Sequence, residues 1–181
     1  MKLQHLLVCG VFGAFATIAA FAIGAALLAT TGIPMIGGLL NAVVVVLILL
    51  TGVRIVNRFG AAILINFIFV AVAIPTMVVG PPGPHKILIG LTAGLLIDVI
   101  ISVFKRRMLG YYIGAILGSA FYPLGVYFIL VYTNAPILGK YISILIPFII
   151  WYAICGAVGT YLALYIYKKK LSDLTFIKSI E

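Results

Sequence analysis

The chain has 181 residues, of which 65% are hydrophobic and 8% are charged, and its mean hydropathy is +1.35. Soluble domains carry about 25% charged residues, so this composition excludes a soluble globular protein, and 12% aromatic residues exclude a disordered chain. The net charge of +9 comes from cations between apolar runs, a pattern typical of membrane proteins and not of a nucleic-acid-binding face. The apolar runs are about 20 residues long without strand-like alternation, which predicts an all-α, polytopic membrane protein.

Six apolar segments are expected to cross the membrane as a single bundle of helices. Prolines at positions 81, 82 and 84 mark the loop after the third segment. We expect the first segment to be a retained helix, because its apolar stretch is longer than the roughly 7–15 residues of a signal peptide. The expected spans are about residues 6–29, 33–52, 60–79, 87–104, 109–132 and 141–167, followed by a basic tail at 168–181.

The basic residues predict the orientation of the bundle. Lys86 and Lys140 lie on one side of the predicted spans, and the ten other Lys and Arg residues lie on the opposite side. Because basic loops are retained in the cytoplasm, this asymmetry predicts a multi-pass protein of the cell membrane with both termini cytoplasmic. The ten are Lys2, Arg54, Arg58, Lys105, Arg106, Arg107, Lys168, Lys169, Lys170 and Lys178.

Catalytic and metal-binding motifs are missing from the sequence. The chain has three acidic residues, Asp98, Asp173 and Glu181, so general acid–base chemistry between two carboxyl groups is not expected. Cys9 and Cys155 both lie within apolar runs and do not have a metal-ligand spacing. We therefore expect a protein that is not an enzyme and needs neither a cofactor nor a metal.

Asp98 and Asn66 are the polar residues of most interest inside the predicted spans. An acid within a span is costly, and by register both residues lie at a similar depth. We expect Asp98 to hydrogen-bond Asn66 or to reach Arg106, joining helices. The alternative is a proton or cation site.

Small residues recur at four-residue spacing in the first segment, at Ala16, Ala20 and Gly24. This spacing lets helices approach closely in lipid. The first segment carries small residues on nearly all sides, which suggests that it contacts its own bundle and also an intramembrane partner.

The side opposite the basic residues is predicted to bind a small organic molecule. An outward-facing cavity with a few polar groups and aromatic walls suits such a ligand. Lys86 would begin the fourth helix, where the helix dipole disfavours a cation, and this misfit favours a functional role. For Tyr132 the alternative is a belt of interfacial aromatic residues. The predicted substrate-binding residues are Asn41, His85, Lys86, Tyr127, Tyr132, Asn134 and Trp151.

The chain resembles the S components of energy-coupling factor (ECF) transporters. The resemblance rests on six short helices, on residues 83–86 (Gly-Pro-His-Lys) running into Gly90, Gly94 and Asp98, and on Ala16-xxx-Ala20 in the first helix. It implies capture of a vitamin or micronutrient from outside, followed by docking of the first helix on a transmembrane T component that works with two cytoplasmic ATPases. The sequence lacks the N-terminal His signature of nickel or cobalt members, so a metal substrate is not expected.

Two other classes of function stay open at the level of the sequence. One is a structural or assembly membrane protein of the cell-shape type, which would need no outer cavity. The other is a stand-alone permease for a small solute, in which Asp98 would couple transport to protons.

Overall fold

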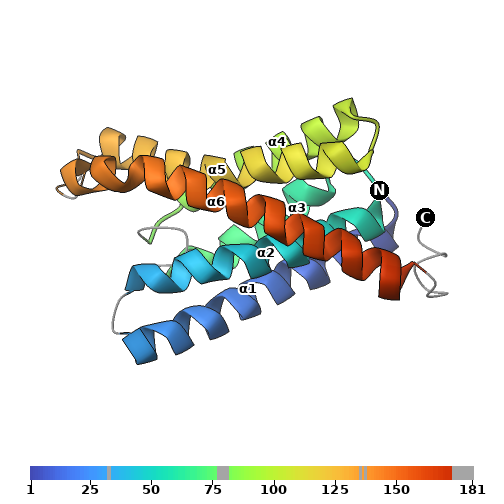
Figure 1. Cartoon of the computed structure of the whole chain (residues 1–181), viewed down its shortest axis with the longest axis horizontal. Coiled ribbons are helices and arrows are strands. Elements are labelled where there is room, and N and C mark those ends of the chain that lie inside the picture. Colours follow the sequence, from blue (N-terminus) through green and yellow to red (C-terminus); the bar gives the residue numbers. More distant parts are fainter. Residues whose placement is uncertain (32–33, 77–81, 135, 137, 173–181) are drawn as a thin grey trace.

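The computed structural model of the chain describes residues 1–31, 34–76, 82–134, 136 and 138–172, without the side chains of residues 27, 28, 31 and 34–40. Over the described residues the chain is helical, with no strand (Figure 1). Figure 1 also shows α1 beginning and α6 ending at the same end of the bundle. The elements are α1 (Leu3–Thr31), α2 (Pro34–Val56), α3 (Ala61–Ala73), α4 (His85–Val103), α5 (Met108–Tyr132), α6 (Leu138–Ile166) and the π-helical turn η1 (Tyr167–Leu171).

The helices form a closed ring in the order α1, α2, α6, α5, α4, α3. Each helix contacts its two neighbours in this ring, and α2 also contacts α3 and α5 across the middle. Consecutive helices are joined by short connections and run antiparallel, as Figure 1 shows for the pair α1 and α2 and for the pair α5 and α6. The ring therefore has an interior lined by all six helices.

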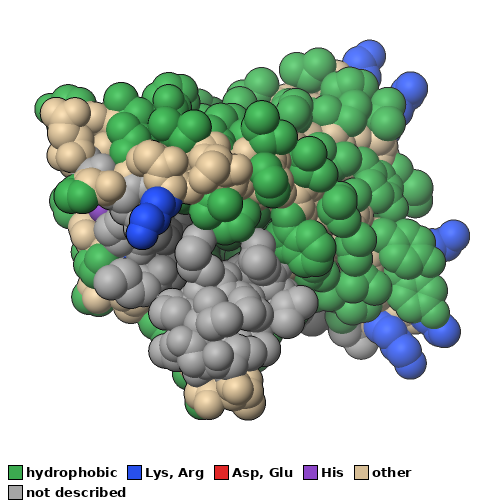
Figure 2. All heavy atoms as spheres, turned by 60° about the vertical axis from the view of Figure 1, so that its left-hand side comes forward, with side chains coloured by type: hydrophobic (Ala, Val, Ile, Leu, Met, Phe, Trp, Pro, Cys, Tyr) green, Lys and Arg blue, Asp and Glu red, His purple; other side chains and the backbone are tan. Residues whose placement is uncertain are grey.

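The surface of the bundle is apolar along most of its length. Large hydrophobic side chains such as Leu88 and Ile146 are exposed, and Figure 2 shows hydrophobic side chains covering much of one face. Within the described residues, four helical stretches are long and apolar enough to cross a membrane. The composition and this surface indicate a helical membrane protein. The four stretches are Leu3–Ala26, His85–Val103, Met108–Tyr132 and Leu138–Leu171.

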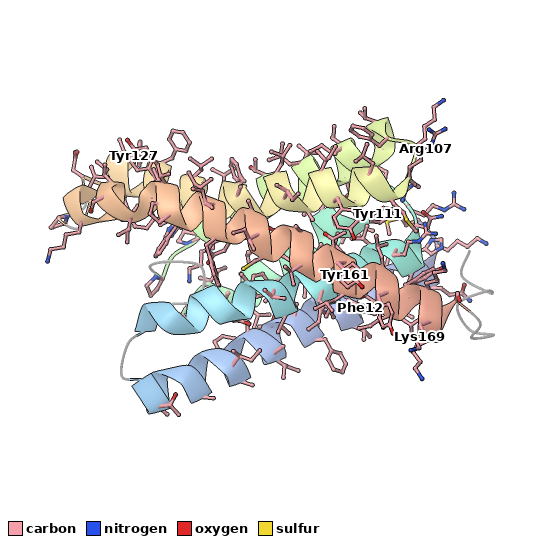
Figure 3. The ribbon with its side chains drawn as sticks, in the orientation of Figure 1. Phe12, Arg107, Tyr111, Tyr127, Tyr161 and Lys169 are labelled. Carbon is pink, nitrogen blue, oxygen red and sulfur yellow. The ribbon has the colours of Figure 1, made fainter. Side chains whose placement is uncertain are left out.

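Basic side chains gather at the end of the bundle where α1 begins. We call this the basic end and define it by Lys2, Arg54, Arg58, Arg106 and Lys168, which line two hollows there. Figure 3 places Arg107 and Lys169 at the same end and Tyr127 at the other. The charge asymmetry expected from the sequence is thus present in three dimensions among the described residues.

α3 is shorter than the sequence analysis predicted. The predicted segment covers residues 60–79, but the helix ends at Ala73, and residues 77–79 lie outside the described part. Pro75 accounts for the early end, since proline has no backbone N–H to donate to the carbonyl oxygen of Ala71, although Ile74 before it keeps helical backbone angles (φ −47°, ψ −53°). At about 1.5 Å per residue α3 covers only about 20 Å, less than the roughly 30 Å of a hydrocarbon core.

Glycines let the helix backbones approach one another inside the ring. A Cβ on Gly94 of α4 would lie 2.7 Å from Cα of Ile63 and 2.8 Å from the carbonyl oxygen of Ala62, both in α3. A Cβ on Gly156 of α6 would likewise lie 2.8 Å from the carbonyl oxygen of Ala115 in α5. Since backbone atoms cannot move aside as side-chain tips can, no larger residue fits at either position without separating the helices.

We expect Gly94→Ala to lower the free energy of unfolding by about 1–3 kcal/mol, because the added methyl group overpacks the contact between α3 and α4. Gly10→Ala is the matched control, since a Cβ at Gly10 has no atom within 4 Å. Thermal unfolding of both variants in detergent measures the difference. Equal melting temperatures for the two variants would contradict the close contact at Gly94.

Candidate functional site

Asp98 of α4 holds the N-terminus of α3. Its Oδ2 accepts hydrogen bonds from the backbone N–H groups of Gly60 and Ile63, each at 3.1 Å. Gly60 occupies the N-cap position of α3 and has no side chain to provide a cap. The carboxylate therefore supplies from another helix both hydrogen bonds of a capping box, and its negative charge lies at the favourable end of the helix dipole.

Lys86 of α4 holds the C-terminus of the same helix. Its Nζ donates to the carbonyl oxygens of Ala73 (2.9 Å) and Thr76, and the side chain has no exposed surface. The backbone N–H of Gly83 donates to the carbonyl oxygen of Ile74 at 3.0 Å. Carbonyl groups at a helix end that are shielded from water need other donors, so these donors stabilise a helix that stops early.

α4 thus carries an anion and a cation at the two ends of α3. Asp98 follows Lys86 by twelve residues, about 18 Å along α4, and α3 is about 20 Å long. Each charge opposes the partial charge of the helix end that it meets. The unfavourable position of Lys86 at the start of α4 is therefore offset by its contacts with the end of α3.

The predicted hydrogen bond between Asp98 and Asn66 is wrong, and Arg106 acts on Asp98 by Coulombic attraction without a hydrogen bond between them. Asp98 hydrogen-bonds the backbone at the start of α3, while Nη1 of Arg106 donates to Oδ1 of Asn57 at 3.2 Å. Asn66 is instead paired with Tyr122 of α5, which donates its hydroxyl to Oδ1 of Asn66 at 2.6 Å. Similar depth in two helices did not bring the side chains together, because Asn66 turns toward α5. Both residues do join helices, as expected.

Two buried amide atoms have no hydrogen-bond partner among the described residues. One is Nδ2 of Asn66, whose side chain has no exposed surface. The other is Oδ1 of Asn41 in α2, whose Nδ2 donates to the carbonyl oxygen of Ala20 at 3.0 Å. An unpartnered buried amide atom costs about 1–3 kcal/mol, so these positions call for a polar ligand or water.

Both amides adjoin one small apolar cluster in the interior of the ring. The cluster consists of Ala16, Ala20, Phe69 and Val70, with Tyr122, Val45 and Ile48 packed against it. Asn41 bonds to a member of this cluster, and Asn66 bonds to Tyr122. α1, α2, α3 and α5 therefore meet in a region that is apolar overall and has one free acceptor and one free donor at its edges.

Asn41 reaches the depth at which α3 ends. A Cβ on Gly52 of α2 would lie 2.8 Å from Cδ1 of Ile65 in α3, so these two residues are level. Asn41 lies eleven residues from Gly52, about 16 Å away, and Ala73 lies eight residues from Ile65, about 12 Å away in the same direction. Asn41 and the polar end of α3 with Lys86 consequently occupy one layer of the bundle.

The other predicted substrate-binding residues lie at or near the end opposite the basic end. His85 is half-buried beside Lys86, and Tyr127 is half-buried in an apolar cluster of α4, α5 and α6. Tyr132 is 87% exposed, Trp151 is 38% exposed, and Asn134 is exposed in the connection after α5. Binding roles for these residues stay predictions. The loop residues 77–81 and the side chains of 34–40, which would border an outer cavity, lie outside the described part.

The predicted docking residues of α1 face the bundle in this conformation. Ala16 and Ala20 are buried against α3, and Gly24 is half-buried. The exposed side of α1 carries bulky residues instead: Leu7, Val11, Phe15 and Ile18. A partner reaches Ala16 and Ala20 only if α1 moves away from α3, and their docking role stays a prediction.

Three functional candidates were missed in the sequence analysis: Tyr122, Arg54 and Tyr111. A hydroxyl within an apolar helix was the available signal for both tyrosines. Arg54, counted only as an orienting charge, lies between two aromatic rings.

Comparison of the chain with models of protein families, with curated proteins and with solved structures finds no match.

Proposed function

We propose that the chain is the substrate-capture subunit of an uptake transporter, of the kind to which ECF S components belong. It would span the cell membrane six times with both termini cytoplasmic and bind a vitamin-like organic molecule without catalysing a reaction. The observation that carries the proposal is the pair of unpartnered amide atoms, Oδ1 of Asn41 and Nδ2 of Asn66, in the interior of the ring.

The chemistry of the region suits a small organic ligand. Oδ1 of Asn41 accepts a hydrogen bond and Nδ2 of Asn66 donates one. By the same residue count Asn66 lies about 15 Å from Asn41 along the bundle, so a ligand that satisfies both atoms would carry a hydroxyl or N–H group at one end and a carbonyl group at the other. The apolar cluster between them would contact the carbon skeleton of the ligand. Access would come from the end opposite the basic end, where Asn41 lies level with the end of α3.

Import by such a subunit needs an energy source on other chains. By the resemblance of the sequence, this source would be a transmembrane T component with two cytoplasmic ATPases. α1 would dock on the T component, and exposure of Ala16 and Ala20 would accompany a movement of α1 away from α3.

The proposal predicts that native mass spectrometry of gently purified protein detects a retained vitamin-sized molecule together with ATPase-bearing subunits. Asn41→Leu should then lower the affinity for that molecule about tenfold or more, since it removes a buried acceptor. The melting temperature without ligand should change little, because the substitution also removes an unpartnered atom. Thr92→Ala is the control, since the Thr92 hydroxyl bonds only to its own helix, at Leu88.

Other outcomes contradict the proposal. An empty protein that copurifies with a cell-wall or cytoskeletal partner would favour a structural role. Solute transport by the protein alone in liposomes, lost in Asp98→Asn, would favour a permease. Wild-type ligand affinity in Asn41→Leu would remove Asn41 from the binding site.

A further inference from the structure

A small hollow at the basic end is lined by cations and by a buried tyrosine, Tyr111. It has a volume of about 260 Å³ and lies between α2, the connection from α4 to α5, α5, and the end of α6 with η1. Its polar lining consists of Arg54, Arg106, Tyr111, Tyr167, Lys168 and Ser172. The volume is below the roughly 300–1,000 Å³ of sites for drug-sized ligands, so the hollow suits a smaller group.

Arg54 is held in place by aromatic rings. Its Cζ lies 5.6 Å from the centre of the Tyr111 ring and 5.0 Å from the centre of the Tyr167 ring. Among the described residues it makes no hydrogen bond or ion pair, so its N–H groups are available to an acceptor. A guanidinium stacked on rings with its donors unused is the arrangement in which arginine binds phosphate or carboxylate groups.

The other charged groups of the hollow have the same sign. Arg106 uses Nη1 to donate to Asn57 at 3.2 Å, and Lys168 is exposed at the rim. Asp98, the acid within the described residues, attracts Arg106 electrostatically but is hydrogen-bonded to the start of α3 and does not line the hollow, while Asp173 and Glu181 lie outside the described part. Three cations around one small space repel one another, and a bound anion would remove that repulsion.

Tyr111 adds an observation that is independent of charge. The residue is 1% exposed and lines the hollow, and its buried hydroxyl has no hydrogen-bond partner among the described residues. A buried hydroxyl without a partner is destabilising, and an anion in the hollow would accept its hydrogen bond.

We propose that this hollow binds a phosphate group, held by Arg54, Arg106 and Lys168 and by the hydroxyl of Tyr111. Basic pockets between helices at the cytoplasmic face of a membrane bind anionic headgroups, and the hollow lies at the end predicted to face the cytoplasm. The phosphate group can belong to an anionic lipid or to a soluble phosphate compound, and the two sources are separable by experiment.

The test uses the full chain in neutral detergent, with phosphatidylglycerol, phosphatidylcholine and inorganic phosphate as probes. Native mass spectrometry measures how much lipid is retained, and thermal unfolding measures stabilisation by each probe. We expect Arg54→Gln to weaken phosphatidylglycerol binding more than tenfold and Tyr111→Phe to weaken it about tenfold. Stabilisation by phosphatidylglycerol alone identifies a headgroup site. Stabilisation by inorganic phosphate that competes with the lipid identifies a site for a soluble phosphate.

Arg107→Gln is the matched control, because Arg107 is exposed at the same end and lines neither hollow. We expect it to change binding less than twofold, in line with a rim charge in water. Equal losses in Arg54→Gln and Arg107→Gln would overturn the proposal, since binding would then follow total charge. Wild-type binding in both Arg54→Gln and Tyr111→Phe would also overturn it. Each result is independent of whether the chain captures a solute.

Discussion

Replacing Lys86 by methionine is expected to lower the free energy of unfolding by about 2–4 kcal/mol, or roughly 5–15 °C in melting temperature. Methionine keeps a long apolar side chain in the same space but donates no hydrogen bond. The carbonyl oxygen of Ala73 would keep the hydroxyl and backbone N–H of Thr76 as donors, whereas the carbonyl oxygen of Thr76 would lose the Nζ of Lys86. The loss should therefore come mainly from Thr76 and from the uncompensated end of the α3 dipole.

Thermal unfolding of the purified protein measures this effect, with Lys140→Met as the control. Lys140 is exposed near the same end of the bundle, so removing its charge should change stability little. If both lysine variants unfold within a degree of the wild type, Lys86 does not stabilise the end of α3.

Removing the Asp98 side chain should have an effect of similar size at the other end of α3. We expect Asp98→Ala to cost about 2–4 kcal/mol, because the partly buried N–H groups of Gly60 and Ile63 would lose their acceptor and the start of α3 would lose a favourable negative charge. Asp98→Asn keeps one acceptor oxygen for these N–H groups, but it loses the charge and replaces the other oxygen by an NH2 donor, so it should cost about half as much. Hydrogen exchange at the first turn of α3 should rise in both variants, and more strongly in Asp98→Ala.

Exchanging the charges of Lys86 and Asp98 distinguishes stabilisation of the two ends of α3 from a direct ion pair between the two side chains. If Lys86 and Asp98 stabilised each other, the double variant Lys86→Asp with Asp98→Lys would recover part of the stability lost in the single variants. If each charge instead stabilises one end of the α3 dipole, the double variant places an anion at the C-terminus and a cation at the N-terminus of α3. It should then be less stable than either single variant. Recovery of stability in the double variant would disprove the helix-end account.

The general architecture was readable from the sequence because it depends on local signals. Long apolar runs predict helices, and the cations between those runs predict that one end of the bundle is basic. In the structure Lys2, Arg54 and Arg106 do lie together at the basic end. The early end of α3 depends on an equally local signal, Pro75, although the predicted segment continues to residue 79.

The partners of the polar residues were not readable in the same way. A buried acid requires donors, but nothing in the sequence indicates that Asp98 finds them in the backbone of Gly60 and Ile63. Depth along a helix follows from residue counting, whereas the facing neighbour depends on how the helices rotate. For this reason the sequence did not indicate that Asn66 accepts a hydrogen bond from Tyr122 of α5, or that Ala16 packs against α3.

The short length of α3 has a consequence for how the protein enters the membrane. α3 alone is too short to cross. α4 alone would carry Asp98 into lipid, at a cost of about 2.5–3.5 kcal/mol for an acid near the centre of a span, and would leave Lys86 of its first turn without the carbonyl groups that it binds. Together the two helices satisfy each other's polar groups. We therefore expect residues 60–103 to integrate as one hairpin, with α4 stably inserted only when α3 accompanies it.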